Sequence, residues 1–388
     1  ATSAPAAAAE SEARQPLQPR RVLRVEKPPR LPVWPVLNGL AYTLLDLFGL
    51  RGAAAWLEDK LGGRVAPMSL DNNLADPFVL LVHHRHGFDW WDPVRPIFGS
   101  ILMPEGFPAH PHRGFETVTM TLRGGLRHRD SIGVKQTYGD GDVQWLTAGR
   151  GVLHEEMWWW GDKDDDSSFS LARGECELYQ LWLNLPAYRR MEQPSTVVLP
   201  DPQAEEVQPG VEVRRLGGGA DSADYVSAAA PPLCKPSRVQ GPGANSANVN
   251  AGRKDVALLR VTLAPGSRYE LPLPAAATAL LYVRQGDIVV GGEGGQEVPR
   301  HNFAYTFREG NALVIANTAD SESADVLLLT GLPLQQRIVS SGTWVVGSER
   351  ELDQADADYR AGRLGVPWDH KLSDDDWRDW TRDYAPLQ

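Results

Sequence analysis

The spacing of apolar residues along the chain predicts mainly β-structure. From about residue 76, apolar and polar residues alternate in short runs that Gly, Asp and Pro separate, as in half-buried strands of a barrel or sandwich. Such runs are PFVLLVHHRH, GFETVTMTLRGGLRHRD, GDVQWLTAGRGVLHEEM and CELYQLWLNLP. The pattern resumes after residue 254 in VALLRVTLAPGSRYELPL, ATALLYVRQGDIVVG, NALVIAN and DVLLLTG. Two β units of similar rhythm indicate an all-β protein with a duplicated antiparallel barrel.

A segment without periodic hydrophobicity separates the two units. Residues 217–254 are rich in Gly, Ala, Ser and Pro, a composition typical of linkers and insertions. We expect the first barrel to span residues 70–216, with EVRRL at 212–216 as its last strand. The second barrel is expected at residues 255–350.

Helical spacing of apolar residues occurs near both ends of the chain. Residues 34–61 predict one amphipathic helix that ends at a glycine pair. Its apolar residues recur at spacings of three and four: Leu37, Leu40, Leu44, Leu47 and Phe48. This face either packs on the protein's own body or docks on a membrane surface or a partner. At the other end, residues 351–365 predict a short helix, and an acidic, Trp-rich tail runs to residue 388.

The start of the chain is Ala-rich and of low complexity. Residues 1 to about 30 are expected to be disordered unless a partner orders them, so the N-terminal extension comprises residues 1–69. The first residue is Ala1, which we interpret as the start of a processed chain after removal of a targeting peptide. This favours an organelle, with the chloroplast first, over the cytoplasm or nucleus. No apolar run reaches the length of a transmembrane helix.

Composition excludes several classes of protein. The 388 residues are 42% hydrophobic and 23% charged, which permits a large core, and the net charge is -11. A protein that binds nucleic acid directly through a basic face of its own is therefore not expected. There are two cysteines, Cys176 and Cys234, too few for a disulfide framework or a Cys-rich zinc site. Any bound metal must be held by histidine and carboxylate.

Two short motifs offer such ligands. Residues two apart on a strand point to the same side, so His110 and His112 share one face. By the same argument His154 and Glu156 share a face, and Glu155 points the other way. Three imidazoles and one carboxylate from two strands suit a divalent first-row metal such as Fe, Mn, Cu, Ni or Zn. Two coordination positions would remain open for substrate, oxygen or water.

Other histidines compete with this set. His84 and His86 form a second pair at the same spacing, without a partner motif of comparable quality. His128 lies beside a turn with alternating charges and is expected in solvent. His301 and His370 stand alone.

The stretches HPHRGFETVTM at 110–120, HRDS at 128–131 and GDVQWLTAGRGVLHEEM at 141–157 together resemble the signature of the pirin family, a branch of the cupin superfamily. The resemblance spans roughly residues 70–216 and resumes over about 255–365. It implies a bicupin with one metal, usually iron as Fe(II), in the first barrel and none in the second. The ligands it implies are the four residues named above.

The same resemblance implies roles for two neighbours of the ligands. Arg113 and Glu116 are expected to fix the ligand strands through an ion pair or hydrogen bonds, in preference to a direct catalytic role. Trp145 and Met157 are expected to pack in the barrel. The WWW run at 158–160 either lines the mouth of the barrel or packs in a core or an interface.

Three functions remain open. Some pirin-like proteins resemble quercetin 2,3-dioxygenases, in which the substrate is a small aromatic enol and Glu156 would serve as ligand and as base. A second function is an iron-dependent transcriptional co-regulator that binds a protein partner. A third is a non-catalytic subunit of an organelle assembly, in the plastid and beside a membrane complex, docked through residues 1–61 or the C-terminal tail.

Overall fold

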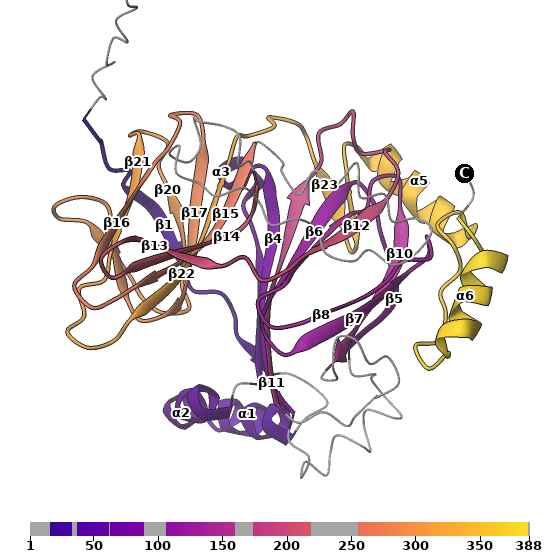
Figure 1. The fold of residues 1–388 in the computed structure, drawn as a ribbon, viewed down its shortest axis with the longest axis horizontal. Coiled ribbons are helices and arrows are strands. Elements are labelled where there is room, and N and C mark those ends of the chain that lie inside the picture. The colour runs from indigo at the N-terminus through magenta and orange to yellow at the C-terminus, as the bar shows by residue number, and fades with distance from the viewer. Residues whose placement is uncertain are drawn as a thin grey trace, which may run out of the picture.

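A computed structural model describes residues 16–32, 37–61, 63–88, 106–159, 174–218 and 255–386, and Figure 1 shows its fold. Two barrels of antiparallel strands lie side by side, and helices occur near both ends of the chain. This is the all-β bicupin architecture that the sequence predicts. The predicted linker falls almost wholly outside the described residues.

The first barrel consists of two antiparallel sheets. The larger has the strand order β12-β9-β6-β11-β4-β3-β2, and the smaller has the order β5-β10-β7-β8. The bounds are β2 Leu31–Pro32, β3 Arg64–Ser69, β4 Phe78–Phe88, β5 Gly106–His112, β6 Phe115–Arg123, β7 Gly125–Asp130, β8 Lys135–Tyr138, β9 Val143–Thr147, β10 Val152–Trp159, β11 Gly174–Asn184 and β12 Ser195–Leu199.

The second barrel repeats this plan. Its larger sheet has the order β1-β20-β17-β22-β15-β14-β13, and its smaller sheet has the order β16-β21-β18-β19. The bounds are β1 Val22–Glu26, β13 Ala204–Gln208, β14 Val211–Gly218, β15 Val256–Leu263, β16 Arg268–Pro272, β17 Thr278–Gln285, β18 Ile288–Val290, β19 Gln296–Val298, β20 Phe303–Thr306, β21 Ala312–Ala316 and β22 Ala324–Gly331. A hairpin of β23 Val339–Ser341 and β24 Trp344–Val346 follows.

The strand at 212–216 belongs to the second barrel, so our assignment of it to the first was wrong. It lies in β14, which pairs with β15 in the register Val213 to Val261. Val211 and Val213 are buried in the core of the second barrel. The alternation of apolar residues is the same whichever sheet a strand joins, which is why sequence order misled here.

Residues 16–30 include a strand of the second barrel, contrary to the disorder expected for residues 1 to about 30; residues 1–15 lie outside the described residues. Strand β1 pairs with β20, with Val25 opposite Ala304. Just before it, Arg20 is fully buried and donates hydrogen bonds to the carbonyls of Ala277 and Pro274 at 2.6 and 2.7 Å. Backbone pairing and this buried guanidinium order the segment without a partner protein.

The predicted helix at 34–61 is two helices, α1 Leu37–Leu47 and α2 Arg51–Leu61. The backbone turns between them at Gly49, whose φ of 72° is costly for residues with a Cβ atom. Among the described side chains of the apolar face, Leu44, Leu47 and Phe48 are 47%, 76% and 72% exposed, so this part of the face is not buried on the protein's own body. In Figure 1 the hairpin lies below the barrels. Within the described residues, no helix has both the length and the hydropathy to cross a membrane.

The C-terminal region forms two helices, α5 Glu349–Arg360 and α6 Asp374–Asp383. Both lie against the first barrel, far along the chain from its strands (Figure 1). Trp368 and Trp377 are buried beside Leu153 of β10. The acidic tail, which we considered as a docking element, therefore covers the smaller sheet of the protein's own first barrel.

A shared apolar core joins the two barrels. It contains residues of β4 and β11 from the first barrel and of β15, β17 and β22 from the second, among them Leu81, Tyr179, Leu258, Tyr282 and Leu329. The second barrel has a separate interior core of its own. The face of β11 that carries Tyr179 is thus turned to the second barrel.

Candidate metal centre

Two adjacent strands bring the predicted histidines together. Strand β5 carries His110 and His112, and β10 carries His154, which lies opposite His110 in the antiparallel register. Pro111 faces the other way because side chains alternate along a strand. One nitrogen of each histidine lies within 4.8 Å of one nitrogen of each of the others.

The three imidazoles face one another closely. The Nε2 atoms of His110 and His154 are 3.1 Å apart, and the ring centroids of His112 and His154 are 4.7 Å apart. His112 and His154 are buried, whereas His110 is partly exposed. The open side of the cluster is therefore at His110.

The unprotonated ring nitrogens of the cluster can coordinate a metal cation. In the described part of the chain, neither ring nitrogen of His112 makes a hydrogen bond of good geometry, and only the Thr343 backbone lies near enough to raise its pKa; such an arrangement costs free energy in a buried imidazole. Burial, together with the neighbouring histidines, lowers the pKa of His112 and of His154 well below the usual value. Nδ1 of His110 lies 2.8 Å from the Pro108 carbonyl, so a proton there leaves Nε2 unprotonated. Neutral imidazoles with free lone pairs fit a divalent metal.

Glu156, the fourth predicted ligand, lies outside this close group of three. Its Oε1 accepts hydrogen bonds from the hydroxyls of Thr119 and Tyr138, each at 3.1 Å. Its Oε2 accepts one from Nε2 of Gln180 at 2.7 Å. Three side chains from β6, β8 and β11 thus hold a buried carboxylate inside the barrel that contains the histidines.

His128 is a neighbour of the cluster that we placed wrongly in solvent. It is fully buried, and its Nδ1 lies 3.4 Å from Nδ1 of His154. Its Nε2 lies 3.1 Å from a carboxylate oxygen of Asp130, which also accepts hydrogen bonds from backbone amides. A carboxylate, an imidazole and a ligand imidazole thus lie in a row, the arrangement that orients metal-bound histidines. The period-two spacing of His128 and Asp130 in β7 could have indicated this.

Arg113 and Glu116 hold the surrounding structure. The Arg113 guanidinium pairs with Asp358 of α5 at 2.8 Å and donates to the Arg150 carbonyl at 2.5 Å. Glu116 accepts a hydrogen bond from Thr147 of β9 at 3.0 Å. Arg113 thus connects the end of β5 to helix α5, and Glu116 connects β6 to β9.

The remaining candidates lie elsewhere. His84 packs against the rings of Phe107 and Trp158, and burial lowers its pKa to about 3. The side chain of His86 lies outside the described residues. Trp145 packs in the shared core and Trp158 in a smaller one. That the second barrel holds no metal stays a prediction.

Two antiparallel barrels with a cluster of histidines inside the first define a bicupin of the metal-binding type. The family model described as Pirin matches residues 69–183, and the model described as Pirin C-terminal cupin domain matches residues 258–365. The chain belongs to the pirin family.

Relatives of known name agree with this assignment. Pirin-1 of Arabidopsis thaliana is 32% identical over 76% of this chain and 86% of its own length. Pirin of Homo sapiens is 30% identical over 75% and 83%. A Pseudomonas aeruginosa protein named "Putative quercetin 2,3-dioxygenase" is 33% identical over 75% and 87%. The crystal structure of a quercetin 2,3-dioxygenase from Acinetobacter baumannii shares the fold, with a TM-score of 0.63 at 24% identity over 89% of this chain and 99% of that one.

Proposed function

We propose that this protein is a metal-dependent dioxygenase of the quercetinase type, which uses molecular oxygen to open a ring of a flavonol-like aromatic enol. The observation that carries the proposal is the cluster of His110, His112 and His154 beside a carboxylate, Glu156, that three hydrogen bonds hold in place. The relative from Pseudomonas aeruginosa supports the same reaction class by its name.

His110, His112 and His154 would hold the metal, with Glu156 as a fourth ligand or as a base beside it. Imidazole and carboxylate ligands suit iron(II), our first choice, and also Mn, Cu, Ni and Zn. When bound, the metal supplies Lewis acidity toward an enol oxygen and a site for dioxygen.

The protein's own groups prepare the substrate. A carboxylate at Glu156 can accept the enol proton, and the hydroxyls of Tyr138 and Thr119 stabilise the charged form of that carboxylate before the transfer. Trp182 lies beside the cluster, with its ring centroid 5.5 Å from that of His112. Its ring offers an aromatic surface against which a flat substrate could stack.

Metal content and oxygen uptake on one sample test this proposal. Mass spectrometry should find about one metal ion per chain, and quercetin should stimulate oxygen consumption. Glu156→Gln should abolish the uptake. Stoichiometric metal without any oxygen uptake on flavonols would reject the dioxygenase and leave a metal protein of another function.

A second candidate function is a subunit of a membrane-associated assembly in an organelle, with the chloroplast as our proposal. It is favoured by the exposed apolar residues of the α1–α2 hairpin, because a group of exposed apolar side chains marks a surface for a protein or membrane partner. They are Leu40, Leu44, Leu47, Phe48, Leu50 and Trp56.

Fractionation of the native organism tests this second candidate. The wild-type protein should sediment with a large membrane-associated complex, and Leu47→Ser combined with Phe48→Ser should release it without loss of metal. A wild-type protein that elutes as a free monomer would reject the assembly role and leave the enzyme proposal unaffected.

A further inference from the structure

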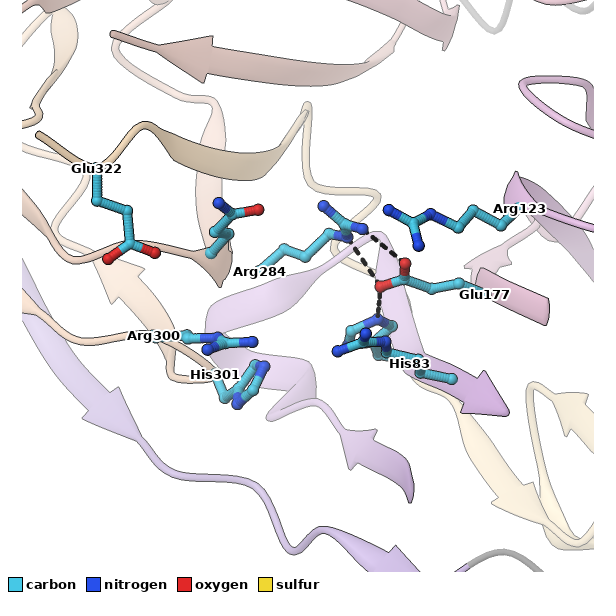
Figure 2. A pocket seen from close by; sticks show the side chains of 9 residues that line it. His83, Arg123, Glu177, Arg284, Arg300, His301 and Glu322 are labelled. Carbon is cyan, nitrogen blue, oxygen red and sulfur yellow. Dashed lines mark hydrogen bonds and ion pairs between the residues drawn. The ribbon is translucent and has the colours of Figure 1, made fainter. Parts of the chain in front are cut away.

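A cavity of about 300 Å³ opens between the two barrels, away from the histidine cluster. His83, Arg85, Arg123 and Glu177 line it from the first barrel. The second barrel contributes Arg284, Gln285, Arg300, His301 and Glu322 (Figure 2). Its size is at the lower limit of small-molecule sites, so it suits a small metabolite.

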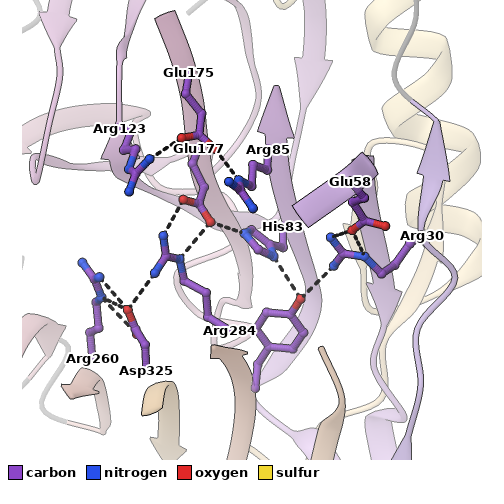
Figure 3. Close-up of polar contacts among 11 residues, drawn as sticks. Arg30, Glu58, His83, Arg85, Arg123, Glu175, Glu177, Arg260, Arg284 and Asp325 are labelled. Atoms are coloured by element: carbon purple, nitrogen blue, oxygen red, sulfur yellow. Dashed lines mark hydrogen bonds and ion pairs between the residues drawn. The ribbon is translucent and has the colours of Figure 1, made fainter. Parts of the chain in front are cut away.

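The lining is richer in cationic than in anionic groups. Four guanidinium groups face two carboxylates, and two imidazoles whose pKa values burial lowers complete the lining. One of these carboxylates, Glu177, is already neutralised: Arg284 donates two hydrogen bonds to it at 2.8 and 2.6 Å, and His83 lies 2.8 Å away (Figure 3). These contacts hold the pKa of Glu177 well below its usual range although burial opposes them. Glu177 therefore adds little net negative charge to the cavity.

A surplus of positive charge lies at one end of the cavity. Arg85 and Arg123 both pair with a single carboxylate, that of Glu175 (Figure 3). The side chain of Arg123 is still 55% exposed and can turn toward a ligand. Glu322 lies at the opposite end of the group in Figure 2, so an anion is favoured beside the arginines.

His301 is built into this cavity at a conformational cost. Its φ of 62° is left-handed, a region that few residues other than Gly adopt, although Asn, Asp and His do so more readily than the rest. Burial and the nearby cations, Arg30 and Arg300 first among them, lower its pKa to about 2. Its imidazole is therefore neutral and can donate one N–H. Within the described ranges, no hydrogen bond from another side chain occupies this ring.

We infer that the cavity between the barrels is a binding site for a small organic anion, one that carries a phosphate or carboxylate group. Arg85 and Arg123 supply the positive charge, and His301 supplies a neutral hydrogen-bond donor. Guanidinium groups form paired, charge-assisted hydrogen bonds with both kinds of oxyanion. A bound ligand contacts both barrels and therefore stabilises their association.

This site is independent of the proposed oxygenase reaction. Alternation along β11 turns Glu177 toward the second barrel, whereas Gln180 points into the first barrel and donates to Glu156. The two sites thus occupy opposite faces of the same strand. Changes in the cavity should leave the metal content unaltered.

Isothermal titration of the full-length protein with orthophosphate and with succinate, at constant ionic strength, tests the inference. At least one anion should bind saturably. Arg123→Gln should weaken binding about tenfold because it removes a positive charge, and His301→Asn should do so because the shorter side chain takes the N–H donor away from the ligand. Asparagine tolerates the left-handed backbone, so the second variant keeps the loop conformation. Arg268→Gln, an exposed arginine that pairs with Glu270 on the second barrel, is the control of equal charge and should bind as the wild type does.

The outcomes separate the alternatives. Binding of orthophosphate alone identifies a phosphate ligand, and binding of succinate alone identifies a carboxylate ligand; both support the site. The inference is overturned if neither anion binds saturably, or if binding is the same in all three variants and the wild-type protein.

Discussion

Glu155 and Glu156 are neighbours in β10, and their carboxylates lie on opposite faces of the strand. One faces the C-terminal tail and the other faces the interior of the first barrel. Glu155 accepts hydrogen bonds from Arg129 and from the Trp368 indole, under the C-terminal tail. Glu156 accepts its three hydrogen bonds inside the barrel, from Tyr138 among others. The pair thus separates the packing of the tail from the chemistry of the candidate metal site.

The two isosteric changes should therefore have different effects. Glu155→Gln removes the nearer of the two carboxylates that pair with the fully buried Arg129, and Asp374 at 3.6 Å remains; the change should lower the free energy of unfolding by about 3 kcal/mol, with metal retained. Glu156→Gln should abolish quercetin-dependent oxygen uptake and change the stability less. Urea denaturation and oxygen electrode measurements on both variants check this. Equal loss of stability in the two would contradict the division between the faces of β10.

The double change of His110 and His154 to Ala should abolish bound metal and leave a folded protein. Both residues contribute nitrogen atoms to the cluster, and the apolar cores on either side do not depend on them. Mass spectrometry of metal content and cooperative thermal unfolding are the two measurements. His84→Gln, in the competing pair, is the matched control and should keep its metal. Stoichiometric metal in the double variant would mean that other ligands hold it.

His128→Gln should weaken metal binding without removing it. The side chain lies between Asp130 and His154 and orients the ligand imidazole. Loss of such an orienting partner typically costs about ten- to a hundredfold in metal affinity. Competition with a chelator of known affinity measures the change. An affinity equal to that of the wild type would show that His154 is held by the strand alone.

Period-two alternation was enough to predict most of the candidate site. It placed His110 and His112 on one face and separated Glu155 from Glu156, and β5 and β10 do pair in the structure. It could not place His128, because charged residues on both faces of β7 make the whole strand look solvent-exposed. In the structure α6 and the tail before it cover the face of Arg129, and the barrel interior encloses the face of His128, beside His154.

Long-range pairing was beyond the sequence pattern. Strand β1 joins β20 and β14 joins β15, although each lies next to the first barrel along the chain. A strand's hydrophobic pattern fixes which face is buried but not which sheet receives it. A helix has the same limit: its pattern shows an apolar face but not what covers that face. For this reason the sequence left open whether the apolar face of α1 packs on the protein or is exposed.

Because β1 completes the second barrel, Arg20→Ala should destabilise the protein. The change leaves buried carbonyls, including those of Ala277 and Pro274, without donors and should lower the free energy of unfolding by about 3 kcal/mol. Arg21→Ala is the adjacent control: its guanidinium lies over the exposed side of Phe307 at 5.1 Å and its loss should cost less than about 1 kcal/mol. Urea denaturation distinguishes the two. Similar midpoints would show that the N-terminal strand contributes little to the barrel.

The stability of the protein should fall with acid partly because of His301. Burial and the surrounding cations lower its pKa in the folded state to about 2, whereas an unfolded histidine has a pKa near 6.5. The groups that face it are Arg30, Arg300, His83 and Arg85. Below pH 6.5 the unfolded chain binds a proton that the folded chain does not, so the stabilising contribution is complete above that pH and declines below it.

His301→Asn should remove this part of the pH dependence. Between pH 7 and pH 5 the wild-type protein should lose about 2 kcal/mol more than the variant, the loss expected for one histidine whose folded pKa lies far below that range. Urea denaturation at both pH values measures the difference, and Arg268→Gln should follow the wild-type curve because its guanidinium does not face His301. If the variant and the wild type lose stability in parallel, His301 takes up a proton in the folded state as readily as in the unfolded chain. That result would contradict the burial and the positive surroundings to which we attribute its lowered pKa.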